Sequence, residues 1–220
     1  MSATDTRERL IAGTLETVKE HGVAGVSARM VATRSGANQA LVFYHFGSVD
    51  NLLAEACRTE TARRVAAYKD KFEAVTNLRE LLDVGRTLHS AEKASRSIAV
   101  LAQLVAASHA NPTLREAVAD GLRLWTVEVE AVLRRVLATS PIDGLLDPAA
   151  LARAVSAGFI GLELFELVDA HAAEDAFAEL ERLSKIAEAI DDLGPIARRA
   201  VRAKLGRLAY NRSGKLRKDS

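Results

Sequence analysis

The sequence predicts an all-α protein, and three observations support that fold class. Apolar residues recur at helical spacing along most of the chain, Ala and Leu fill most positions expected to be buried, and no segment is a convincing strand. With 220 residues, 49% hydrophobic and 27% charged, the chain is long enough for a sizeable core in one or two domains. We expect a small N-terminal group of three helices, joined by a fourth helix to a larger helical domain.

The N-terminal helices follow from spacing and capping residues. Apolar residues at Leu10, Ile11, Leu15 and Val18 predict a helix over residues 6–21. Two short helices follow, the second over about residues 38–43. Ser48 is then expected to cap a helix that runs to about residue 72, with Asp50 in its first turn near the positive end of the helix dipole.

The remaining two thirds of the chain predict further helices. Their expected ranges are 78–89, 97–108, 113–138, 148–170, 174–193 and 196–210, with a loop over 139–147. Three of the breaks fall at Asn111-Pro112, Pro148 and Gly194-Pro195. Residues 97–108 are almost wholly apolar, which predicts a helix buried on all sides.

Residues 27–46 contain the most informative pattern. Gly36 separates the two short helices, and glycine adopts the positive φ of a sharp reversal without steric cost. Asn38 is suited to capping the second helix. Val31 and Val42 give each short helix an apolar side chain to bury. The pattern predicts a helix-turn-helix, which offers its second helix to the major groove of DNA.

This part of the chain resembles the tetracycline-repressor-like (TetR) regulators. The matching positions lie within about residues 7–55 and are Gly22, Ser27, Val31-Ala32, Gly36, Phe43-Tyr44-His45-Phe46 and Leu52-Leu53. The resemblance implies a DNA-binding head, a ligand pocket and a homodimer held by two late helices. Phe43 and Val49 depart from the family, which usually has tyrosine and lysine there as phosphate contacts. We therefore expect Tyr44, His45 and the N-terminus of the next helix to bind more of the DNA backbone.

The expected DNA contacts divide into base-reading and phosphate-binding residues. Gln39 is the best base reader, because its amide can pair with N6 and N7 of adenine, and Ala40 offers apolar contact to a thymine methyl. The resemblance assigns phosphates to Ser27, Tyr44 and His45, and Arg29 is placed to join them. The full set is Ser27, Ala28, Arg29, Asn38, Gln39, Ala40, Phe43, Tyr44 and His45. Ser27 as a helix cap alone, Arg29 as a surface charge and His45 as a packing residue stay open.

A single head reads only a few base pairs, so we expect a homodimer on a pseudo-palindromic operator. Its recognition helices would lie about 34–36 Å apart or a little more. The expected dimer elements are the helices over 113–138 and 148–170. On the second, Ala150, Ala154, Gly158 and Gly161 share one face and would let another helix approach closely. Packing of this stripe within the monomer is the alternative.

The resemblance also implies a pocket for a small-molecule effector between the connecting helix and the dimer helices. The candidates are Phe72, His89, Gln103, Leu104, His109, Trp125, Phe159, Glu163 and Phe165. Trp125 and Phe159 offer flat apolar walls, and Gln103 or Glu163 a polar group. Ordinary packing is the alternative for each residue. We expect a largely apolar effector, no cofactor and no metal.

We divide the chain into a DNA-binding domain over residues 1–48, an effector-binding and dimerisation domain over 49–210, and a basic, disordered tail over 211–220. Residues 196–220 hold nine Lys or Arg residues against one Asp. This basic end is either a solubilising tail or a source of nonspecific attraction to DNA phosphates.

Charge and cysteine content limit the partners and the location. The net charge of +1, with eight basic and seven acidic residues in 1–64, gives no electrostatic support for nucleic-acid binding. The single cysteine, Cys57, fits a reducing compartment and is expected to be a small buried hydrophobe. We expect no signal peptide and no apolar run near the length of a membrane span, and therefore a cytoplasmic protein.

Two other function classes remain as alternatives. The sequence has no Glu-x-x-His pair, no His-Glu-x-x-His, no Gly-x-Ser-x-Gly and no glycine-rich phosphate loop, so we do not expect an enzyme. A helical module that binds protein or lipid without contacting DNA is the other alternative. Salt-sensitive, sequence-specific duplex binding distinguishes the expected regulator, which we take to be a repressor, from both.

Overall fold

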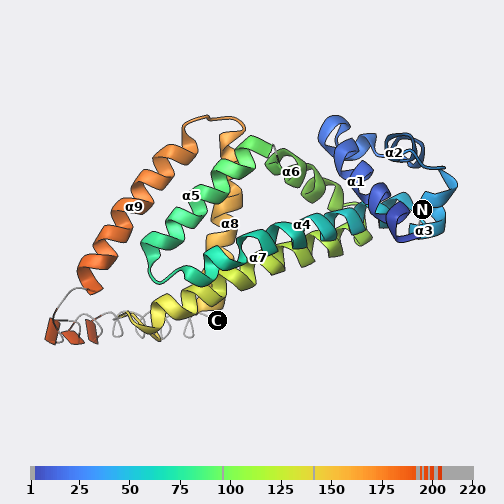
Figure 1. Ribbon diagram of the computed structural model, residues 1–220. Coiled ribbons are helices and arrows are strands. Elements are labelled where there is room, and N and C mark those ends of the chain that lie inside the picture. The colour runs from blue at the N-terminus through green and yellow to red at the C-terminus, as the bar shows by residue number, and fades with distance from the viewer. Residues whose placement is uncertain are drawn as a thin grey trace, which may run out of the picture. The chain divides into compact units, whose positions relative to one another are not determined.

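The structure is a computed structural model that describes residues 3–95, 97–140 and 142–191, together with residues 194, 196, 197, 199, 200, 203 and 204. These residues form helices and contain no strand, which confirms the all-α fold class (Figure 1). The expected helix over 196–210 lies largely outside the described residues, and the tail over 211–220 lies wholly outside them.

The helices follow the expected order. They are α1 (Ala3–His21), the 3₁₀ helix η1 (Val23–Gly25), α2 (Ala28–Ser35), α3 (Ala40–Phe46), α4 (Val49–Ala74), α5 (Leu78–Ser95), α6 (Ser97–Ser108), α7 (Pro112–Ala138), α8 (Pro148–Glu166) and α9 (Ala172–Asp191). Helix α5 is longer than expected, because residues 90–95 contain no glycine or proline to end it. Helix α8 is shorter, because the chain turns after Glu166, where the Val168 N–H donates to the Phe165 carbonyl at 3.0 Å.

The chain divides into two compact units. The first contains residues 1–69 and 88–125, and the second contains residues 70–87 and 126–220. Helices α4, α5 and α7 contribute residues to both. These units are defined by contacts between residues. The expected boundary at residue 48, which separates a DNA-binding domain from an effector-binding domain, is defined by function and stays a prediction.

The first unit contains the core of the helix-turn-helix. Leu10 and Ile11 of α1, Val31 of α2, Val42 and Phe46 of α3 and Leu52 of α4 are buried together. Val31 and Val42 are the apolar side chains that the sequence pattern predicted the two short helices would bury. Four helices therefore bury one core, and we call α1–α3 the head.

A second core in the first unit connects the head to later helices. Val18 of α1 packs with Leu53 of α4, Leu104 of α6 and Leu114 of α7. Cys57 belongs to the same core, and burial raises the pKa of its thiol, as expected for a small buried hydrophobe.

The prediction that α6 is buried on all sides is wrong. Leu104 is buried in the second core, but Gln103, Val105 and Ala106 are exposed. The helix packs with one face on α1, η1 and α7, and an apolar composition does not show which face is covered.

In the second unit, Arg86 of α5 anchors α9. Its Nη2 donates to the Glu181 carboxylate at 2.8 Å and to the Phe177 carbonyl at 3.2 Å, and its guanidinium lies 5.8 Å from the centre of the Phe177 ring. The hydrogen bond from Arg86, with a second one from Lys185, lowers the pKa of Glu181 to about 2.

The expectation that no apolar run comes near the length of a membrane span is wrong for helix α8, in the second unit. By length and composition alone it is apolar enough to cross a membrane, and no other helix among the described residues is. A single helix of this kind is weak evidence for a span.

Candidate nucleic-acid interface

The turn between α2 and α3 has the geometry that the sequence predicted. Gly36 has φ of 58°, in the left-handed region, and the Ala37 N–H donates to the Ala32 carbonyl at 2.9 Å. Arg9 of α1 reinforces the turn, because its Nη2 donates to the Gly36 carbonyl at 2.9 Å and to the Ser35 carbonyl. In return, Ser35 Oγ donates to the Arg9 carbonyl at 3.0 Å. Sequence reasoning missed this role of Arg9, which joins residues 26 positions apart.

The N-terminus of α2 is capped by Ser27. Its Oγ accepts from the Met30 N–H at 3.3 Å, so the capping role is confirmed. Ser27 and Arg29 are exposed, whereas Ala28 is only 5% exposed and packs in the core of the head. Ala28 can therefore meet DNA only through its backbone.

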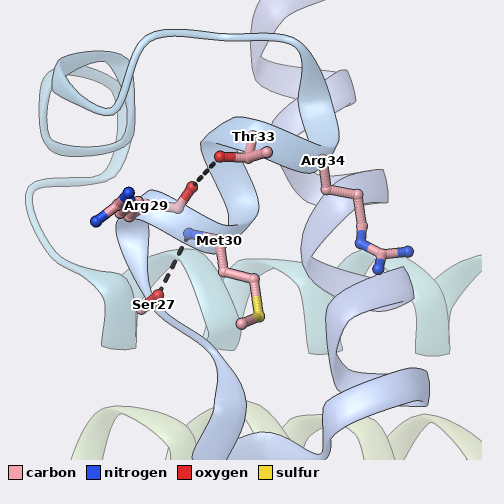
Figure 2. A pocket seen from close by; sticks show the side chains of 5 residues that line it. All are labelled: Ser27, Arg29, Met30, Thr33 and Arg34. Carbon is pink, nitrogen blue, oxygen red and sulfur yellow. Dashed lines mark hydrogen bonds between the residues drawn. The ribbon is translucent and has the colours of Figure 1, made fainter.

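An open hollow of about 410 Å³ lies along α2. It is lined by Ser27, Arg29, Met30, Thr33 and Arg34. Figure 2 shows the Arg29 and Arg34 side chains extending from opposite sides of α2, with Met30 between them. Sequence reasoning missed Met30, Thr33 and Arg34, although each lies within five residues of Arg29 on the same short helix.

The two arginines of the hollow differ in their partners. Arg34 makes a two-bond ion pair with Glu20 of α1, with Nη1 donating to Oε1 at 2.7 Å and Nη2 to Oε2. This pairing lowers the pKa of the Glu20 carboxyl. Arg29 makes no ion pair with the described residues, and its carbonyl accepts from Thr33 Oγ1 at 2.9 Å. Arg29 is the better placed of the two to bind a phosphate.

Helix α3 presents one face to solvent. Asn38 Oδ1 accepts from the Ala40 N–H at 2.8 Å, which confirms that Asn38 caps this helix. Gln39 and Ala40 are exposed, Phe43 is 48% exposed and Tyr44 is 79% exposed. Val42 and Phe46 are buried on the opposite face, so Ala40, Phe43 and Tyr44, with Gln39 just before the helix, form its outer face.

His45 and Val49 lie closer to the core than the outer face does. His45 is half-buried, and its ring contacts those of Tyr44 and Phe46 edge-on, with centroids 5.0 and 6.2 Å away. Val49, one of the two positions where the chain departs from the expected TetR pattern, packs against the core of the head. The start of α4 is held by Ser48, whose Oγ accepts from the Asn51 N–H at 3.0 Å, as expected of its cap.

The expected effector residues are divided between the two units. His89, Gln103, Leu104, His109 and Trp125 belong to the first unit, and Phe72, Phe159, Glu163 and Phe165 belong to the second. Leu104, Phe72 and Glu163 are buried, and Trp125 lies 5.9 Å from the Tyr68 ring. His109 and Phe165 are exposed, and His89 and Phe159 are half-buried. Gln103 Oε1 accepts from the Val23 N–H of η1 at 2.9 Å. A shared effector site stays a prediction.

The small-residue stripe of α8 lies on an open surface. Ala150, Ala154 and Gly158 are exposed and Gly161 is half-buried, and a Cβ at Gly158 or Gly161 would meet nothing within 4 Å. The same side of α8 continues to Phe165, and Val168, in the turn that follows the helix, is 86% exposed. In α9, Leu180, Leu183 and Ile186 are also exposed. Sequence reasoning missed the α9 residues, although their three-residue spacing was visible.

Comparisons with known proteins agree with the geometry of the head. Residues 10–56 match the family model of bacterial regulatory proteins, tetR family. The HTH-type transcriptional repressor AcnR of Corynebacterium glutamicum is 30% identical over 60 residues, which are 27% of this chain and 32% of that protein. The matched segment thus spans about a third of the curated relative.

Solved structures match nearly the whole fold. A protein from Rhodococcus sp. assigned to the TetR family of transcriptional regulators is 23% identical over 84% of this chain and 98% of its own, with a TM-score of 0.67. A protein from Streptomyces coelicolor A3(2) assigned as a transcriptional regulator is 26% identical over 80% of this chain and 97% of its own, with a TM-score of 0.62. These likenesses extend the match beyond the head to the later helices.

Proposed function

Because the chain belongs to the tetR family of bacterial regulatory proteins, we propose that it is a homodimeric, sequence-specific DNA-binding regulator that responds to a small-molecule effector. Members of this family are DNA-binding regulators rather than enzymes, in agreement with the non-enzymatic prediction. A cytoplasmic location is part of the proposal.

The exposed face of α3 carries the proposal. Ala40, Phe43 and Tyr44 are exposed together on a helix whose other face is buried in the head, and Gln39 is exposed just before it. A helix held in this way can enter the major groove without losing its packing. Gln39 reads a base through its amide, and Ala40 and Phe43 give apolar contact to thymine methyl groups.

The phosphate contacts come from the two ends of the helix-turn-helix. Ser27 and Arg29 are exposed at the start of α2, and Tyr44 is exposed near the end of α3. The cluster is small, so its salt dependence should be shallow beside that of a protein with many phosphate contacts. His45 takes part through the edge of its half-buried ring, and Asn38 fixes the start of α3.

The second copy is proposed to pack on α8, one of the two helices expected at the dimer interface, and on α9, which the sequence did not suggest. Gly158 and Gly161 of α8 leave room for a helix to approach. Phe165 and Val168, and Leu183 and Ile186 of α9, are exposed apolar residues. Exposed apolar patches of this kind mark protein interfaces. The apolar character of α8 fits burial in a dimer better than a membrane span.

Repression with release by an effector is the regulatory mode we propose. Repression, as opposed to activation, is supported by the match to a segment of AcnR, a protein named as a transcriptional repressor. An effector weakens DNA binding if it binds more tightly to a dimer whose heads are spaced wrongly for adjacent major grooves. A hundredfold loss of affinity needs about 2.7 kcal/mol of coupling. Helix α4 is proposed to transmit the effect of the effector to the head, because it contributes residues to both compact units.

Selection of duplexes from a random library tests the proposal. The full-length protein should enrich a pseudo-palindrome, whose two half-sites match the two-fold symmetry of a dimer. Light scattering on the purified protein should give the mass of two chains. Enrichment of no sequence would favour a helical module that does not bind DNA, and enrichment of a single half-site by a monomer would remove the dimer from the proposal.

A further inference from the structure

One side chain of α6 reaches the head directly. Gln103 Oε1 accepts from the Val23 N–H at 2.9 Å, across 80 positions of sequence. Val23 is the first residue of η1, which lies between α1 and α2. The preceding residue, Gly22, has no side chain to cap η1, so Gln103 provides a cap from another helix.

The backbone at Gly22 is shaped to admit this side chain. Its φ of 72° lies in the region that favours glycine, and a Cβ there would lie 2.5 Å from Gln103 Oε1. Any other residue at position 22 would therefore strain the turn and displace the Gln103 amide. Gly22 and Gln103 form a matched pair.

The composition of α6 singles out Gln103 for this contact. From Ile98 to Ala107 it is the only residue that is not apolar. Val100, Leu104 and Ala107, which flank it on the helix surface, pack in the same core as Val18, Val23 and Val26. The hydrogen bond thus lies beside an apolar contact between α6 and the segment that leads into α2.

The contact bears on DNA binding through the chain that follows η1. Only Val26 separates η1 from Ser27, the cap of α2, and Ser27 and Arg29 belong to the proposed phosphate-binding set. Fixing Val23 to α6 therefore limits the positions that the start of α2 can take. This hold on the head is separate from α4, which follows α3 at Val49.

We propose that Gln103 is a positioning residue that ties the α1–α2 turn to α6 and thereby sets the affinity of the head for its operator. The proposal rests on the DNA-binding function proposed above, and it replaces the effector contact that the sequence suggested for Gln103. Without the hydrogen bond between Gln103 and Val23, the α1–α2 turn is less ordered in the free protein. DNA binding must then order the turn, and this cost weakens the complex.

The test uses the full-length protein and a duplex selected by the wild type. Gln103→Leu removes the acceptor at similar size, Gln103→Glu keeps an acceptor oxygen, and Val105→Leu changes a neighbouring exposed residue of α6. Fluorescence anisotropy gives the dissociation constant of each protein, and amide hydrogen exchange by NMR reports the protection of the Val23 N–H. Thermal unfolding shows that each variant is folded at the assay temperature.

We expect Gln103→Leu to weaken duplex binding about two- to tenfold, the range for loss of one hydrogen bond, and to speed exchange at Val23. Gln103→Glu should stay within about twofold of wild type and keep the protection, as should Val105→Leu. Specific binding that is unchanged or tighter in Gln103→Leu, or Val23 exchange that does not speed up, would overturn the proposal alone. A wild-type protein that selects no duplex would overturn the proposed function, and this proposal with it.

Discussion

Replacing Gly36 with alanine should destabilise the protein through the turn of the helix-turn-helix. Gly36 has φ of 58°, and an L-residue in the left-handed region costs about 1–2 kcal/mol. A Cβ there would lie 3.0 Å from Arg9 Nη2, which donates to the Ser35 and Gly36 carbonyls. Weakening those hydrogen bonds adds about 0.5–1.5 kcal/mol. The expected loss in the free energy of unfolding is therefore about 1.5–3.5 kcal/mol.

Urea denaturation followed by circular dichroism measures this loss. The protein concentration must be the same for each variant, because the apparent stability of a dimer depends on it. Gly36→Asn is the matched control: it places the same Cβ beside Arg9, but asparagine tolerates the left-handed region, so it should lose clearly less. A Gly36→Ala protein as stable as wild type would refute the turn geometry, and equal losses in the two variants would refute the role of φ.

Three further predictions concern charge and assembly. Val168→Asp should place a carboxylate in the proposed dimer surface, so that light scattering gives the mass of one chain. An intact dimer would exclude Val168 from the interface. Arg29→Ala should lower the slope of log affinity against log salt by about 1, whereas Arg34→Ala should change it less because Glu20 already pairs Arg34; equal slopes in both variants would contradict the distinction. The pKa of Glu181 is about 2 in the fold against 4.5 ordinarily, so its ionised form stabilises the protein above about pH 4.5 and this stabilisation is lost as the pH falls towards 2. Glu181→Gln should accordingly be less stable than wild type at pH 7, with a difference that shrinks between pH 4.5 and 2 in thermal unfolding; a constant difference would contradict the pairing.

The parts of the fold that local chemistry determines could be predicted from the sequence. Asn38 and Ser48 each cap the helix expected of them, because a cap acts on backbone groups two or three residues away. Gly36 takes the positive φ expected of it for a similar reason. The burial of Val42 was likewise expected, because a short helix needs an apolar side chain to pack against its neighbours.

The contacts between distant segments could not be predicted in this way. Arg9 binds the turn 26 positions later, and Gln103 binds η1 80 positions earlier. Nothing in the local pattern of either residue shows its partner. Ala28 was included among the expected DNA contacts, yet its small side chain packs in the core of the head. An almost wholly apolar helix such as α6 likewise gives no periodicity from which to choose its covered face.

The most direct test of the account is the binding of the wild type and Gln39→Ala to a selected duplex and to a scrambled duplex of the same composition. Gln39 is exposed on the outer face of α3 and is assigned to reading a base. We predict that the wild type prefers the selected duplex and that Gln39→Ala loses about 1–3 kcal/mol of that preference at one position of each half-site. Its affinity for the scrambled duplex should stay unchanged. Equal wild-type affinity for the two duplexes would contradict the claim that this chain is a sequence-specific DNA-binding regulator.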